Sequence, residues 1–122
     1  MKRALSLLVA LSAAAFLFAD GTRVDLRATL TGPNRAKGKA EWQTRDQGTR
    51  MQAELEVEGE HLAHNAPMTV TVGDQTFAVT TNDFGSFELE LRFNGPVRPT
   101  IVVGTAVAVT DGAGDTVLTG MF

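Results

Sequence analysis

The chain has 122 residues, 43% of them hydrophobic, and 11 Lys and Arg against 14 Asp and Glu give it a formal net charge of −3. This length suits one globular domain, and a mildly acidic chain has no electrostatic reason to bind nucleic acid or an anionic membrane. The sequence holds no cysteine, which excludes disulfide bonds and a lipid anchor on an N-terminal cysteine.

Residues 1–19 are predicted to form a signal peptide. Met1-Lys2-Arg3 is a basic start, and an unbroken run of apolar and small residues follows it from Ala4 to Ala19. The run is shorter than the roughly 20 residues that span a bilayer as a helix, and it ends in a small residue. Cleavage after Ala19 is therefore favoured over an uncleaved anchor. Cleavage would place the mature protein in the periplasm or outside the cell.

From residue 20 onward the pattern predicts strands. Apolar and polar residues alternate with a period of two in the clearest segments, as in half-buried strands. Turns rich in Gly, Asp, Asn and Pro separate these segments. In chain order the expected strands are 24–30, 38–44, 51–57, 68–72, 76–80, 87–93, 105–110 and 116–122. About eight short strands and no helical period predict one all-β domain over residues 20–122, a small antiparallel β-sandwich.

The aromatic residues are expected to serve this core rather than an exposed binding strip. The strand phenylalanines are in phase with their apolar neighbours: Phe77, Phe87 and Phe93. The only tryptophan, Trp42, is in phase with Ala40, which leaves both a core and a surface position open. Phe84 lies in a predicted turn and is expected to pack down onto the core.

One short stretch is basic. Arg35, Lys37 and Lys39 have alternate spacing, which would place them on one face of a strand. The favoured interpretation is a solvated sheet edge whose charges discourage aggregation. The alternative is a binding patch.

Several segments resemble bacterial secreted chordin-type (CHRD-like) domains, and the resemblance covers nearly the whole mature chain. They are Leu26-Arg27-Ala28-Thr29-Leu30-Thr31-Gly32, Gly38-Lys39-Ala40-Glu41-Trp42, Leu55-Glu56-Val57-Glu58-Gly59, Pro99 through Gly104, Val107-Ala108-Val109 and Val117-Leu118-Thr119-Gly120-Met121-Phe122. The resemblance implies an extracellular β-sandwich that acts as an interaction module. It implies no catalytic residues.

The best candidate for a chemical site lies between the third and fourth expected strands. His61 and His64, the 2 histidines of the chain, follow Glu60 and precede Met68. Imidazole, carboxylate and thioether groups are metal ligands, and neutral imidazole suits zinc, copper or nickel. A metal site normally needs three or four ligands in fixed geometry. The competing interpretation is a polar surface loop that happens to carry two histidines.

Other polar groups are better explained by turns and solvated faces. Asp111 and Asp115 flank glycines as in calcium loops, but calcium needs six to eight oxygens and a hairpin turn explains both residues. Ser86, the only serine after residue 19, lacks the G-x-S-x-G context of a nucleophile. The glutamates of residues 54–58 point one way off one strand. Catalysis is therefore not expected.

These observations predict an exported, non-catalytic β-sandwich that serves as a structural or protein-interaction module. Its partner would be another protein, held at an exposed sheet edge or apolar patch. The outward faces of the strands carry Glu, Gln and Arg, so the mature domain is not expected to insert into a membrane. No cofactor is expected. The alternative function is periplasmic metal binding through His61 and His64, with Glu60 as a third ligand.

Overall fold

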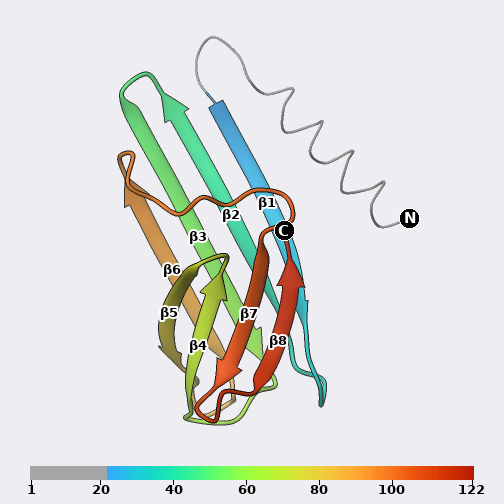
Figure 1. The fold of residues 1–122 in the computed structure, drawn as a ribbon. Coiled ribbons are helices and arrows are strands. Elements are labelled where there is room, and N and C mark those ends of the chain that lie inside the picture. The colour runs from blue at the N-terminus through green and yellow to red at the C-terminus, as the bar shows by residue number, and fades with distance from the viewer. Residues whose placement is uncertain (1–21) are drawn as a thin grey trace, which may run out of the picture.

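The computed structural model describes residues 22–122, which form an all-β domain (Figure 1). Its strands are β1 (Thr22–Thr31), β2 (Lys37–Gln47), β3 (Arg50–Glu60), β4 (Pro67–Val72), β5 (Gln75–Thr80), β6 (Phe87–Asn94), β7 (Ala106–Asp111) and β8 (Thr116–Met121). They confirm the predicted all-β fold and each predicted strand to within a few residues. The predicted signal peptide lies outside the described residues. Within these residues no helix is long and apolar enough to cross a membrane.

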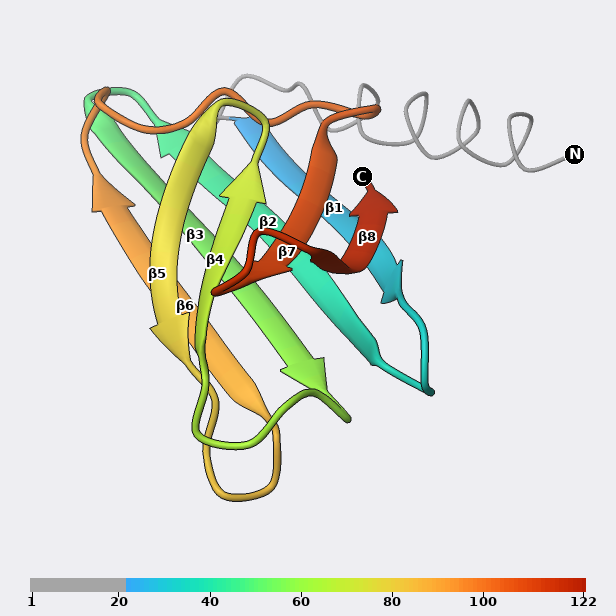
Figure 2. The ribbon, with the colours of Figure 1, turned by 60° about the horizontal axis from the view of Figure 1, so that its bottom comes forward.

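All eight strands belong to one antiparallel sheet in the order β5-β4-β7-β8-β1-β2-β3-β6. The sheet folds over into two layers. Figure 2 shows β5, β4, β7 and β8 in front of β6, β3, β2 and β1. The layers are continuous at one side, where β8 pairs with β1 through Thr31 opposite Thr119. The result is a barrel-like sheet that does not close on itself, because its end strands are β5 and β6.

The core fills the space between the layers. Along β3 the inward residues Ala53, Leu55 and Val57 alternate with outward glutamates, as the sequence period predicted. Trp42 is only 2% exposed and its ring lies 6.1 Å from that of Phe93, so it belongs to the core. Gly59 leaves room for a neighbour, because a Cβ there would overlap the ring of Phe87.

Phe84 corrects one expectation, because its side chain is 82% exposed rather than packed on the core. The turn itself forms as expected, with Gly85 at a φ of 74°. The side-chain oxygen Oδ1 of Asn82 accepts hydrogen bonds from the backbone N–H groups of Phe84 and Ser86, at 2.9 and 3.0 Å. Backbone groups and the Asn82 side chain close this turn by themselves, so the turn does not require the Phe84 side chain to pack on the core.

The interpretation of the basic stretch as a sheet edge is also wrong. Lys37 and Lys39 share one solvent face, but their strand β2 lies inside the sheet between β1 and β3. Lys37 pairs with Glu60 at 3.3 Å and Lys39 with Glu58 at 3.5 Å. Arg35 lies in the preceding turn with a φ of 66°. Alternation marked the solvent face correctly, but it carries no information on the place of a strand in the sheet.

The long connection between β6 and β7, residues 95–105, crosses one end of the two layers (Figure 1). It is fastened to β2 by two hydrogen bonds from the Arg98 guanidinium to the Asp46 carboxylate, at 2.9 and 2.6 Å. Both side chains are mostly covered, with 17% and 23% exposed. The hydrogen bonds from Arg98 lower the pKa of Asp46 below its ordinary 3.8, although burial opposes the shift.

Arg98→Gln is expected to lower the free energy of unfolding by about 1–2 kcal/mol at neutral pH, because a partly buried bidentate ion pair is lost. Because the pKa of Asp46 is lowered in the folded state, this group contributes stability above pH 3.8. That stability is lost as the pH falls through the folded-state pKa. The difference from wild type should therefore shrink in acid. Urea denaturation at neutral and acidic pH measures it. Arg92→Gln is the control, because Arg92 is 71% exposed and its loss should cost well under about 1 kcal/mol.

Candidate functional site

The sheet is incomplete between its two end strands. No ladder joins β5 to β6 within residues 22–122, although the two strands face each other across the layers (Figure 2). Inward side chains are fully buried in the middle of the sheet but only half-buried here. We call this strip the open seam, and its inward residues are Phe77, Val79, Leu89, Leu91 and Phe93. Apolar groups at the seam thus lack the covering strand that their counterparts have elsewhere.

The backbone of β6 has one unpaired side. The N–H of Gly95, just after β6, donates to the carbonyl of Met51 on the β3 side, at 2.7 Å. Because backbone groups alternate in direction along a strand, the odd-numbered residues of β6 also face β3. The even-numbered residues turn their N–H and C=O groups to the free side: Glu88, Glu90, Arg92 and Asn94. An extended chain laid along β6 would find these groups ready to pair.

The solvent face of β6 belongs to a larger acidic surface. Strand register places Glu41 opposite Glu56 and Glu56 opposite Glu90, while Glu58 lies opposite Glu88. We call this surface the carboxylate face, and its members are Glu41, Glu54, Glu56, Glu58, Glu88 and Glu90. Partial burial, followed by repulsion from Glu58, Glu41, Glu90 and Glu88, raises the pKa of Glu56 above its ordinary 4.5. The face therefore holds more negative charge than its neighbouring cations offset.

Glu56→Gln is expected to stabilise the fold at pH 7 by about 0.5–1 kcal/mol, because like charges directly opposite each other are destabilising. Because the pKa of Glu56 is raised in the folded state, the stability that this group contributes is fully present below pH 4.5. It is lost as the pH rises through the folded-state pKa. The gain should vanish in acid and shrink at high salt. Thermal denaturation as a function of pH measures it. Glu60→Gln is the control and should give no gain, since Glu60 already pairs with Lys37.

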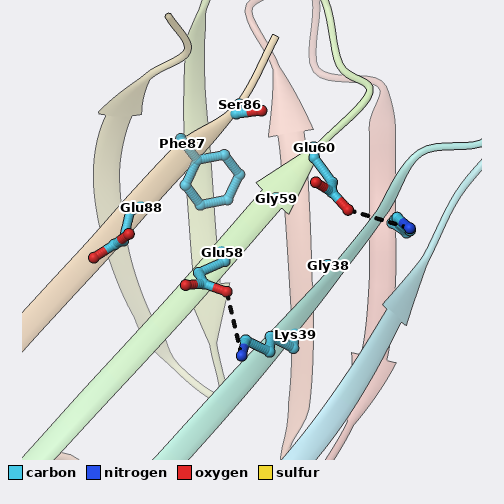
Figure 3. Close-up of a pocket in the computed structure, with 9 residues that line it drawn as sticks. Gly38, Lys39, Glu58, Gly59, Glu60, Ser86, Phe87 and Glu88 are labelled. Carbon is cyan, nitrogen blue, oxygen red and sulfur yellow. Dashed lines mark ion pairs between the residues drawn. The ribbon is translucent and has the colours of Figure 1, made fainter. Parts of the chain in front are cut away.

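A shallow hollow of about 430 Å³ lies at one end of the carboxylate face (Figure 3). Its lining includes Gly38 and Gly59, and its rim carries the two lysine–glutamate pairs described above. Oxygens of Glu56, Glu58 and Glu88 approach within 4.8 Å of one another beside this hollow. Three carboxylates are fewer than calcium needs, and Lys39 already pairs with Glu58, so the cluster alone is no metal centre.

The histidine loop, residues 61–66, is exposed at both of its histidines. His61 has a φ of 61°, and Glu60 is engaged by Lys37. Met68 is buried and faces the core. Among residues 22–122, no set of three histidine or carboxylate ligands that includes His61 or His64 lies within ligand distance. A metal site at His61, His64 and Glu60 stays a prediction, to be checked by zinc and copper titration of wild type and the double alanine variant.

The acidic glycine loop acts as a turn. Oδ1 of Asp111 accepts hydrogen bonds from the backbone N–H groups of Ala113 and Asp115, at 3.0 and 2.9 Å. The carboxylate that a calcium site would use therefore holds the β7–β8 hairpin together. Ser86 lies immediately before β6 and lines the hollow.

Comparison with models of known protein families, with curated proteins and with solved structures found no match. The resemblance to chordin-type domains stays a prediction from the sequence. The seam was missed by sequence reasoning, because strand order decides which strands end the sheet. The uncharged sequence of β5, QTFAVT, could not have revealed it, because the interior strands β4 and β8 also lack charged residues.

Proposed function

We propose that this protein is an exported, non-catalytic interaction module that binds an extended segment of another protein along β6. The observation that carries the proposal is the free edge of β6 beside the open seam. Backbone groups of Glu88, Glu90 and Arg92 face away from β3, and the inward side chains of Leu89 and Leu91 are only half-buried. A strand added there would pair with these backbone groups and would cover the side chains of Leu89 and Leu91.

Charge supports one class of partner segment. Residues of an added strand that lie opposite Glu88 and Glu90 would point to solvent beside the carboxylate face, where Lys or Arg would be favoured. The residues between them would point inward onto Leu89 and Leu91 and would be apolar. The partner segment is therefore expected to alternate basic and apolar residues. The negative charge of the carboxylate face would also attract such a basic segment toward the free edge of β6.

Two further observations agree with an exported module. The basic and apolar start of the sequence is that of a signal peptide, and the resemblance to chordin-type domains implies an extracellular interaction role. The metal-binding alternative has less support, because Glu60 and Asp111 already serve an ion pair and a turn.

Peptide titration tests the proposal, with Trp42 as the probe. The chain has 1 tryptophan and no tyrosine, and the Trp42 ring packs 6.1 Å from that of Phe93 on β6. A peptide alternating lysine with valine should change the fluorescence saturably, and a glutamate–valine peptide should not. Equal binding of both peptides, or of neither, would overturn the proposal.

Two variants at one position separate backbone pairing from charge. Glu90→Pro removes an N–H that faces the free side, so the β3 ladder loses no hydrogen bond. It should abolish binding of the basic peptide. Glu90→Ala keeps the N–H and should weaken binding only about twofold to fivefold. Equal losses in the two variants would mean that charge alone, and no added strand, accounts for binding.

A further inference from the structure

The other end strand, β5, lacks the charges, prolines and bulges that commonly protect a free edge. Its sequence, QTFAVT, has no charge and no proline, and its register with β4 is unbroken from Pro67–Thr80 to Val72–Gln75. The outward side chains Thr76, Ala78 and Thr80 are exposed and small. Free edges in monomeric proteins usually carry lysine, proline, a bulge or inward charges. This edge therefore calls for a partner.

The direction of the β5 backbone follows from its neighbours. The N–H of Gly73, which follows β4, donates to the carbonyl of Ala106 on β7 at 2.9 Å. Backbone groups alternate in direction, so the even-numbered residues of β4 face β5. Their partners in register are Gln75, Phe77 and Val79. The residues left with N–H and C=O groups on the free side are Thr76, Ala78 and Thr80.

We propose that two copies of this chain associate by antiparallel pairing of β5 with β5 about a two-fold axis at Ala78. In this register Ala78 meets Ala78 of the second copy, and Thr76 meets Thr80 at both ends. It is the one antiparallel register in which all three outward-facing residues pair. Phe77 then lies opposite Val79 of the second copy, so each half-buried apolar side chain gains an apolar neighbour.

The second copy fits this edge because the edge is neutral and complementary to itself, as a two-fold interface requires. Pairs of threonine and alanine bring no like charges together. Pairing two β6 strands would instead set two carboxylate faces side by side, with their uncompensated charge. The inference goes beyond the proposed function, since it concerns the other end strand, β5, and a second copy of the chain as the partner.

Because the native sequence has no cysteine, a disulfide can form only at a cysteine introduced by substitution. Directly opposed residues of a hydrogen-bonded antiparallel pair have Cα atoms about 5.5 Å apart, within the disulfide range. Purified protein carrying Ala78→Cys should therefore form a covalent dimer under mild oxidation. Ala108→Cys, on the outer face of interior strand β7 in the same layer, should stay monomeric. Equal cross-linking of the two variants would overturn the proposal.

Sedimentation of the unmodified protein supplies the non-covalent test. Wild type should dimerise with rising concentration, and Ala78→Lys should remain monomeric because two lysines would meet on the axis. Ala108→Lys should dimerise like wild type. A monomeric wild type, or a dimer lost in Glu90→Pro but kept in Ala78→Lys, would overturn the proposal. Binding of the basic peptide by monomeric Ala78→Lys would show that the β6 function survives without dimerisation.

Discussion

Trp42→Ala is expected to lower the free energy of unfolding by about 3–5 kcal/mol, the usual cost of removing a buried tryptophan. The side chain is 2% exposed, and it packs between Leu26 and Leu55, its register partners on β1 and β3. Its removal would leave a cavity beneath the loop of residues 95–105. Stability of a domain this size is on the order of 5–15 kcal/mol, so much of it would be lost.

Urea denaturation followed by circular dichroism measures this effect, because the variant retains no tryptophan for fluorescence. Val97→Ala is the control. Val97 is 88% exposed, so its change should stay within about 0.5 kcal/mol. An unchanged midpoint for Trp42→Ala would contradict the packing described for the core.

Gly85→Ala is the second substitution with a large expected effect, about 2–4 kcal/mol of destabilisation. Gly85 has a φ of 74°, and a Cβ there would overlap the carbonyl oxygen of Leu62. Since that contact is with backbone, the histidine loop itself would have to move. The loop is also held by the N–H of Leu62, which donates to the carbonyl of Gly85 at 3.0 Å.

Gly114→Ala is a matched control, because Gly114 has a φ of 87° but a Cβ added to it would meet no atom within 4 Å. The variant carries the conformational cost alone, about 1 kcal/mol. Thermal denaturation of the two variants separates backbone strain from the overlap with Leu62. Equal destabilisation would show that the loop of residues 61–66 is not packed against Gly85 as described.

The strands were predictable because each one buries a single face. In β3 and β6 the alternation is nearly perfect, so the period of two stands out against any helical pattern. The two tight hairpins were predictable from glycine and aspartate in their turns, such as Gly73, which has a φ of 61°. Local chemistry therefore accounts for the elements and for most of the core.

Strand order was not predictable, and the errors follow from that. Lys37 and Lys39 suggested an edge, but long-range pairing places β2 between β1 and β3. The open seam depends on β5 and β6 lying at the ends of the order, a property of the whole chain. The exposed side chain of Phe84 depends on a turn that Asn82 closes without it. These features arise from tertiary contacts that a period of two does not encode.

The most direct test of the central claim is an amide map of peptide binding by ¹H–¹⁵N NMR. The labelled protein is titrated with the unlabelled lysine–valine peptide. A strand added along β6 predicts that shifts and slowed exchange concentrate at the amides of Glu88, Glu90 and Arg92, with smaller changes at the Trp42 indole. Shifts confined to the histidine loop, residues 61–66, or no shifts at all, would contradict it.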